Sequence, residues 1–229
     1  MTLVTLDQLS HVTRTALMKH GAAEWVADQV ARAVVEAEAT GAPAYGLSRL
    51  EVVCADLDAG RINGHAEPKV TQPHGDTIVA DACGGFSTPA FARGLPQAVE
   101  HARQTGAALI LVRDAATATM PGFFTAQIAR AGMIGLALAD AGTRRLAVSL
   151  PDGAGGVARQ FETDPRNLPA DTGLPEAEAK TALHRLVSPA DAPELVARLL
   201  TLGADQPRQF SDPVAVPDGL WSRAEQLAR

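Results

Sequence analysis

Three short apolar runs in the middle of the chain constrain its fold more than any other feature. They occupy residues 108–112, 133–139 and 146–150, and turn residues bound each of them. Runs of this length and composition are typical of buried strands. Residues 122–131, between the first two runs, have helical periodicity. Strands that alternate with helices favour an α/β or α+β fold with a mixed sheet.

The first sixty residues have a different pattern, with apolar side chains at helical spacing. The spacing predicts helices over 6–20, 22–40 and 47–60. Gly21 and Gly41 follow the first two helices, as expected of glycines that end a helix. The N-terminal part is therefore expected to be a small helical bundle.

A hairpin and a longer helix are expected next. Residues 69–72 and 77–82 read as two strands joined by a tight turn. Residues 89–104 read as a helix with Thr88 as its cap, and Pro96 inside it is expected to bend the helix.

The last part of the chain changes character again. Gly, Pro, Asp and Asn crowd residues 152–175, which indicates a long loop or a domain boundary, and helices are expected at 176–187, 191–202 and 218–228. We therefore divide the chain into a helical part at 1–65, an α/β sheet core at 66–150 and a loop-rich and helical segment at 151–229. These three parts could also form one continuous domain.

Composition excludes several classes of function. The net charge is −6 and the pI is about 5.5, and no run of Lys or Arg could neutralise phosphates, so neither nucleic acid nor membrane is expected as a partner. We expect a cytoplasmic protein, because the sequence contains neither a signal-peptide pattern nor an apolar run that could span a bilayer. Cys54 and Cys83 are far apart and the six histidines are dispersed, so no metal site is expected.

Six local strings resemble the malate/L-lactate dehydrogenase family of the second, non-Rossmann type, which includes ureidoglycolate, sulfolactate and piperideine-2-carboxylate oxidoreductases. Their order and spacing carry the resemblance, which covers roughly the first 165 residues. The resemblance implies a shortened form of that fold and a homodimer whose sites borrow residues from both subunits. The strings are AEATGAPAYGLSRL (37–50), LDAGRIN (57–63), IVADACGGF (78–86), AVEHARQTGAALILVRD (98–114), GFFTAQIARAGMIGLALAD (122–140) and TDP (163–165).

The resemblance also implies a chemistry, which is hydride transfer between a nicotinamide cofactor and a 2-oxo or 2-imino acid. A His in a Ser-His-Gly turn assists that transfer in the family, and Tyr45 occupies its position here, after Ala44. A phenol is a poorer proton donor and acceptor than imidazole near neutral pH. Arg49 is retained and could hold a carboxylate through its planar fork. Alternatively, Arg49 pairs with Glu51, Asp56 or a neighbouring helix.

Other strings of the family have lost their polar residues. An Asn-His pair corresponds to Ala116-Thr117, which leaves Thr117 as a binding candidate. A Gly-Thr-Asn-Pro string at the cofactor corresponds to residues 162–165, where Thr163 and Asp164 are candidates for cofactor binding. Glu162 precedes them with a carboxylate that would repel a pyrophosphate. The family also continues for over a hundred residues, with a further Asp and a Gly-rich string that this sequence lacks.

Two further features of the sequence bear on function. Asp114 follows a predicted buried strand, where α/β proteins often place functional side chains, so it is a binding candidate; capping the next loop is the alternative. Residues 151–158 fit a Gly-rich dinucleotide pattern, but no helix start follows them, so we expect a flexible turn there.

Two hypotheses follow. The first is a pseudoenzyme that binds a small carboxylate or a protein partner and needs no cofactor. The second is an enzyme, either an NAD- or NADP-dependent oxidoreductase acting on a 2-oxo or 2-hydroxy acid, or one with altered chemistry in which Tyr45 donates a proton beside Arg49. A phenol can act so only where neighbours favour its ionised form, and no lysine is near Tyr45 in the sequence. The identity of a substrate stays open.

Overall fold

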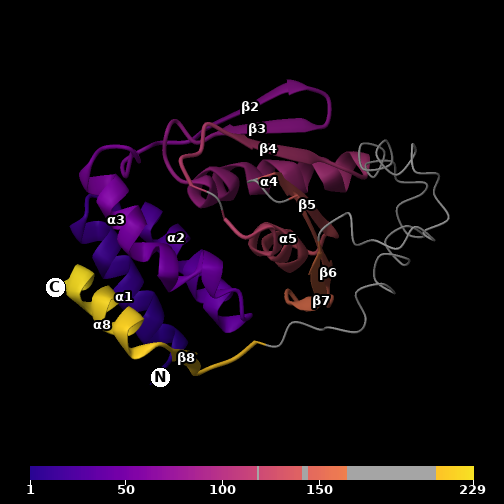
Figure 1. The fold of residues 1–229 in the computed structure, drawn as a ribbon. Coiled ribbons are helices and arrows are strands. Elements are labelled where there is room, and N and C mark those ends of the chain that lie inside the picture. The colour runs from indigo at the N-terminus through magenta and orange to yellow at the C-terminus, as the bar shows by residue number, and fades with distance from the viewer. Residues whose placement is uncertain (118, 141–143, 164–209) are drawn as a thin grey trace.

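Helices from both ends of the chain pack together at one side of the molecule (Figure 1). The structure is a computed structural model that describes residues 1–117, 119–140, 144–163 and 210–229. The C-terminal helix α8 contacts α1 and α3, and α1 packs along α2. The helices of this part are α1 (Leu6–Lys19), α2 (Glu24–Ala39), α3 (Leu50–Asp58) and α8 (Asp218–Ala228).

Local sequence explains where the first helices begin and end. Thr5 and Gln8 form a capping box, in which each side chain accepts a hydrogen bond from the other residue's backbone N–H. Gly21 follows α1 with a φ of 91°, a left-handed conformation that glycine adopts at no steric cost. The predicted third helix begins at Leu50 instead of residue 47, because residues 47–49 form a 3₁₀ turn, η2 (Leu47–Arg49), which Gly46 separates from another, η1 (Pro43–Tyr45).

The largest hydrophobic core lies among these helices. A short antiparallel pair, β1 (Thr2–Val4) and β8 (Val214–Val216), adds three buried valines to it. Neither strand was predicted, because three residues are too few to show an alternating pattern. The buried members of this hydrophobic core are Val4, Leu9, Ala16, Leu17, Ala22, Val26, Ala27, Val34, Ala39, Leu47, Leu50, Cys54, Leu57, Ile62, Phe86, Val214, Val216 and Ala224.

A second layer contains the sheet β2-β3-β4 with helix α4 (Ser87–Thr105) against it. The predicted hairpin is confirmed as β2 (Lys69–His74) and β3 (Thr77–Asp81), and β4 (Leu109–Arg113) runs parallel to β3 after the crossover through α4. The prediction of Thr88 as a cap is wrong. Helix α4 begins at Ser87, because the extended residue before it is Phe86, whose side chain is buried in the core.

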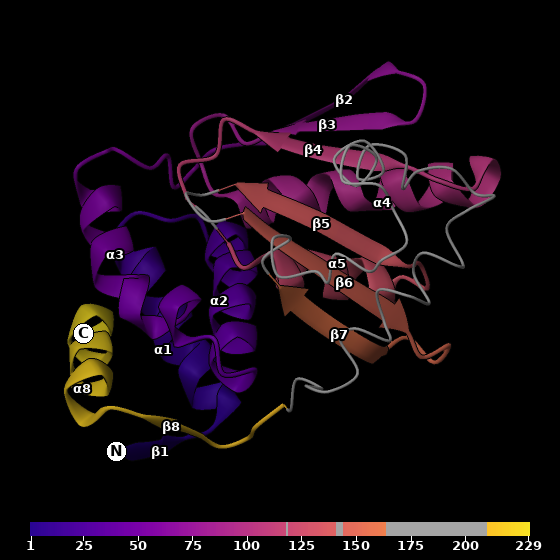
Figure 2. The same cartoon turned by 45° about the vertical axis from the view of Figure 1, so that its right-hand side comes forward.

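The third sheet is antiparallel and lies beside helix α5 (Pro121–Arg130), as Figure 2 shows. Its strands are β5 (Gly135–Asp140), β6 (Arg144–Pro151) and β7 (Val157–Thr163), of which β7 was not predicted. The glycine-rich stretch is the turn between β6 and β7. Asp152 orders this turn by accepting hydrogen bonds from the N–H groups of Ala154 (2.7 Å) and Gly156 (2.8 Å), which lower the pKa of its carboxyl group.

Of the three helices predicted after residue 175, one lies in the described part of the chain. The helix predicted at 218–228 is confirmed as α8, whereas those predicted at 176–187 and 191–202 lie outside the described residues. No helix in the described part is both long and apolar enough to cross a bilayer.

Burial and the nearby charge of Asp58 raise the pKa of the Cys54 thiol to about 12.

Candidate functional site

A small cavity lies where α2, the two 3₁₀ turns, the start of α4 and the segment before α5 meet. Its volume is about 50 Å³, which is room for a few water molecules or for a ligand of a few non-hydrogen atoms. Three residues singled out in the sequence, Tyr45, Arg49 and Thr117, line it together. The other lining residues are Leu17, Val30, Ala33, Val34, Gly46, Leu50, Val53, Phe86, Thr88 and Thr119.

Arg49 supplies a positive charge at this cavity. Its side chain is exposed, and within the part of the chain that the structure describes it forms no ion pair. The two acidic residues considered as its partners are engaged elsewhere, Glu51 with Arg223 (3.4 Å) and Asp56 with Arg61 (2.7 Å). The guanidinium is therefore available to a carboxylate, which its planar fork can bind through two hydrogen bonds.

Tyr45 contributes packing to the same cavity. Its half-buried ring lies against a small core cluster formed by Ala33, Met120 and Phe123. Its hydroxyl forms no hydrogen bond with the described residues. Tyr45 and Arg49 do not share one regular helix face, because each ends its own 3₁₀ turn.

Glu38, at the end of α2, holds the backbone of these turns in place. Its Oε1 accepts a hydrogen bond of 2.7 Å from the N–H of Leu47. A side chain at Gly46 would overlap the Glu38 carboxylate, so only glycine fits there without displacing it. Burial raises the pKa of Glu38, and the hydrogen bond from Leu47 partly opposes that shift. Sequence reasoning missed Glu38, although an acidic residue between two alanines before the turn is a detectable signal.

The Glu38→Gln variant is expected to change how stability depends on pH. A raised pKa in the folded state means that the contribution of Glu38 to stability is present below its ordinary value of 4.5 and is lost as the pH rises through the folded value. Glutamine removes this loss and can still accept the hydrogen bond from Leu47. Urea unfolding between acidic and neutral pH should therefore show the variant gaining stability over wild type as the pH rises. Parallel curves would contradict this, and the exposed Glu67→Gln variant is the control.

Threonines from the start of α4 and from the segment before α5 also line the cavity: Thr88, Thr117 and Thr119. Ser87 and Thr119 form a hydrogen bond of 2.8 Å between their side-chain oxygens. Thr88 is buried beside Ser87, and Thr117 is half-buried. The cavity thus combines one cation with several neutral hydrogen-bonding groups, an arrangement suited to a small polar anion.

Asp114, also singled out in the sequence, lies outside the cavity lining and is exposed. Its φ of 51° is unusual for a residue other than glycine, and Cys83 at the end of the neighbouring strand has a φ of 52°. The Asp114 carbonyl accepts a hydrogen bond of 3.0 Å from Gly84 N–H, so this residue joins the two loops that follow β3 and β4.

The region proposed for a cofactor meets the start of α5. Glu162, on β7, accepts a hydrogen bond of 3.3 Å from the N–H of Gly122 in the first turn of that helix. A carboxylate is favourable at a helix N-terminus, where it occupies the place of an anionic ligand. Thr163 ends β7, and Asp164 lies outside the described residues.

Two other polar features are accounted for by structural contacts. A wider hollow of about 310 Å³ lies against α1, α3 and α8, but its His20 pairs with Asp58 (2.7 Å) and its Arg223 with Glu51. In the described residues no group of three or more His, Cys, Asp or Glu could hold a metal ion.

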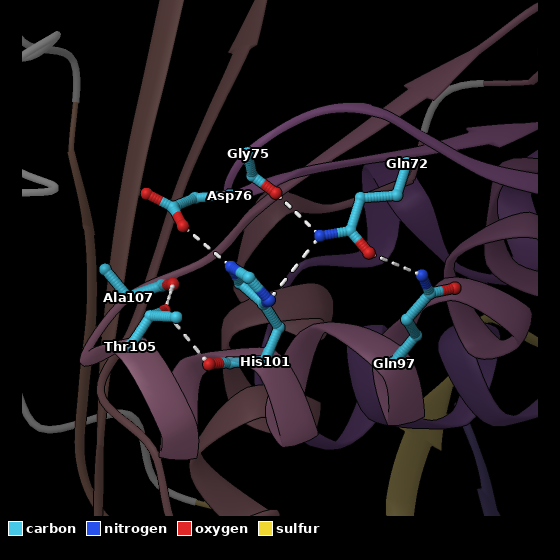
Figure 3. A network of polar contacts seen from close by, with 7 residues as sticks. All are labelled: Gln72, Gly75, Asp76, Gln97, His101, Thr105 and Ala107. Atoms are coloured by element: carbon cyan, nitrogen blue, oxygen red, sulfur yellow. Dashed lines mark hydrogen bonds and ion pairs between the residues drawn. The ribbon is translucent and has the colours of Figure 1, made fainter.

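The second polar feature is a network of hydrogen bonds that fastens the β2–β3 hairpin to α4 (Figure 3). His101 Nε2 contacts Asp76 at 2.6 Å, and the amide of Gln72 lies 3.5 Å from His101 Nδ1. Gln72 in turn accepts a hydrogen bond of 2.9 Å from Gln97 and donates one of 2.6 Å to the carbonyl of Gly75.

Comparison with known proteins agrees with the resemblance. The malate/L-lactate dehydrogenase family profile matches residues 4–165. The (2R)-3-sulfolactate dehydrogenase (NADP(+)) of Chromohalobacter salexigens is 30% identical over 139 residues, which are 61% of this chain and 41% of that protein. A Δ1-pyrroline-2-carboxylate/Δ1-piperideine-2-carboxylate reductase of Pseudomonas aeruginosa is 34% identical over 112 residues, which are 49% of this chain and 34% of the reductase. The chain thus spans less than half the length of these relatives.

Solved structures show the same fold. Malate dehydrogenase from Entamoeba histolytica superposes with a TM-score of 0.65 at 23% identity, over 72% of this chain and 49% of that one. Sulfolactate dehydrogenase from Methanocaldococcus jannaschii superposes with a TM-score of 0.59 at 16% identity, over 96% of this chain and 67% of that one. The expected fold class, helices with a mixed-sheet core, is therefore confirmed.

Proposed function

We propose that this chain, which belongs to the malate/L-lactate dehydrogenase family, binds a small carboxylate in the cavity beside Arg49. One observation carries the proposal: Arg49 lines a cavity of about 50 Å³, and its guanidinium has no acidic partner within the described residues. A charge-assisted pair of hydrogen bonds is the strongest contact that such a site can offer an anion. The names of the relatives agree, since sulfolactate, pyrroline-2-carboxylate and malate are all carboxylates.

The described residues do not fit a nicotinamide cofactor at the start of α5. Glu162 already binds a backbone N–H of the first turn of that helix, where the helix dipole would otherwise favour a phosphate. A second negative charge there would be repelled. We therefore propose binding without hydride transfer.

Tyr45 supports this choice. Its ring packs on Ala33, Met120 and Phe123, and no described group is placed to take a proton from its hydroxyl or to give one to it. A residue that relays a proton needs such a partner within hydrogen-bond reach. In this proposal the phenol closes one wall of the cavity.

A second candidate function is NAD- or NADP-dependent oxidation or reduction of a 2-oxo or 2-hydroxy acid. The family match over residues 4–165 favours it, because the relatives that this chain resembles are dehydrogenases and reductases. In that case Tyr45 and Arg49 would face the acid, and Thr163 and Asp164 would contact the cofactor.

One pair of titrations separates the two functions. Calorimetry with acetate, glycolate, propionate and L-lactate, each to millimolar concentration, is expected to show saturable binding that weakens with added salt, because the contact is ionic. Reduced and oxidised nicotinamide cofactors, added with pyruvate or L-lactate, are expected to show no binding and no change in nicotinamide absorbance. Turnover in the second experiment would establish the oxidoreductase, and absence of carboxylate binding in the first would refute the proposed function.

A further inference from the structure

Three valines line the cavity beside Arg49 and give it an apolar wall. Val30 and Val34 lie four residues apart on α2, so they share one face of that helix, and Val53 belongs to α3. Val30 and Val53 are half-buried, so their methyl groups keep accessible surface, whereas Val34 is 8% exposed and belongs to the largest core. This part of the lining can offer a ligand van der Waals contact and no hydrogen bond.

Two threonines of the lining add little polar surface. The Oγ1 of Thr88 is buried so completely that a ligand in the cavity cannot reach it. The hydroxyl of Thr119 is already engaged with Ser87, at 2.8 Å. Neither hydroxyl is therefore free to meet a polar group of a ligand.

The polar side chains that remain match the needs of one carboxylate. Arg49 is exposed and can donate two hydrogen bonds from its fork, and the half-buried side chains of Tyr45 and Thr117 can each donate one. An ionised carboxylate has about four lone-pair sites, so it can use all of these donors. A further polar group on the ligand would find only the valines.

We propose that the cavity selects short carboxylic acids with a plain apolar tail, such as acetate and propionate, over acids whose tail carries a second polar group. The inference rests on the proposed function, because Arg49 must hold the carboxylate for the tail to meet the valines. A hydroxyl group on the tail would leave water and gain no partner, and a second carboxylate would be more costly to bury. This preference is the opposite of what the names of the relatives indicate, since sulfolactate and malate both carry further polar groups.

The test compares acids that differ in the tail alone. Calorimetric titration of wild type is expected to show acetate binding about threefold to tenfold more tightly than glycolate, and propionate exceeding L-lactate by the same factor. Malonate, which replaces the end of the propionate tail by a second carboxylate, is expected to bind at least about tenfold more weakly than propionate.

A pair of variants on one helix locates the tail. Val30→Thr keeps nearly the same shape and adds a hydroxyl to the cavity lining, so it is expected to bind L-lactate and propionate with equal affinity. Val35→Thr makes the same change at another half-buried position of α2, outside the lining, and is expected to keep the preference. Val53→Thr repeats the first change from α3 and replaces Val30→Thr if urea unfolding shows that variant to be unfolded.

The outcomes distinguish this inference from the proposed function. Wild type that binds glycolate or L-lactate as tightly as the plain acid, or more tightly, would overturn the inference while carboxylate binding stands. A preference that survives unchanged in the folded valine-to-threonine variants of the lining would also overturn it, because the tail would then lie away from the valines. Absence of binding by all of these acids would refute the proposed function and this inference together.

Discussion

The Arg49→Met variant is expected to bind small carboxylates about tenfold to a hundredfold more weakly than wild type, because hydrogen bonds to a charged group contribute about 1.5–3 kcal/mol. Methionine keeps an unbranched apolar side chain of similar reach and removes the cation. The free energy of unfolding should change little, since Arg49 is exposed and forms no ion pair with the described residues. Calorimetric titration with glycolate measures the first effect, and urea unfolding measures the second.

Two matched variants separate the fork of Arg49 from its charge. Arg49→Lys should bind with intermediate affinity, because an ammonium group keeps the charge but lacks the planar pair of donors. Arg61→Met removes another exposed cation, one that is paired with Asp56, and it should leave binding unchanged. Undiminished glycolate binding by Arg49→Met would place the anion elsewhere in the molecule.

The helices were predictable where periodicity and a terminal glycine agree. Helices α1 and α2 fulfil both conditions, and each ends within two residues of its predicted end. Strands β1 and β8 were missed because three residues have no visible period, and their pairing joins residues more than two hundred positions apart. Strand β7 was missed because its residues Arg159, Gln160 and Glu162 make it too polar to resemble a buried strand.

The cavity was predictable only in part. Tyr45, Arg49 and Thr117 came from a resemblance, and the structure brings them together. The sequence predicts Thr88 as a helix cap and not as a cavity residue. Its place in the cavity depends on how the start of α4 packs against the turns after α2, which local sequence does not show. Asp114 fits the rule that functional side chains follow strands, yet its backbone joins two loops instead. Sequence spacing places a residue on an element, whereas tertiary packing decides which elements meet.

The Leu47→Ala variant is expected to lower the free energy of unfolding by about 2–5 kcal/mol, as other truncations of fully buried leucines do. Leu47 is 1% exposed and lies in the largest core cluster, although it belongs to a short turn and not to a long helix. The loss combines the transfer of the missing methyl and methylene groups with the cavity that they leave. Urea unfolding monitored by circular dichroism measures it.

Leu47 also lies between Tyr45 and Arg49, the two residues of the 3₁₀ turns proposed to meet the carboxylate, so we expect its side chain to link stability to binding. The core holds its side chain and Glu38 holds its N–H, which together set the direction of the turn that ends at Arg49. Leu47→Met keeps the volume and should cost less than about 1.5 kcal/mol, while Val52→Ala, at an exposed position on α3, should cost less than about 0.5 kcal/mol. A Leu47→Ala variant as stable as Val52→Ala would mean that the turn is not anchored in the core. Glycolate binding measured below the onset of unfolding should weaken in Leu47→Ala and stay unchanged in Val52→Ala, because only the first releases the turn that positions the guanidinium.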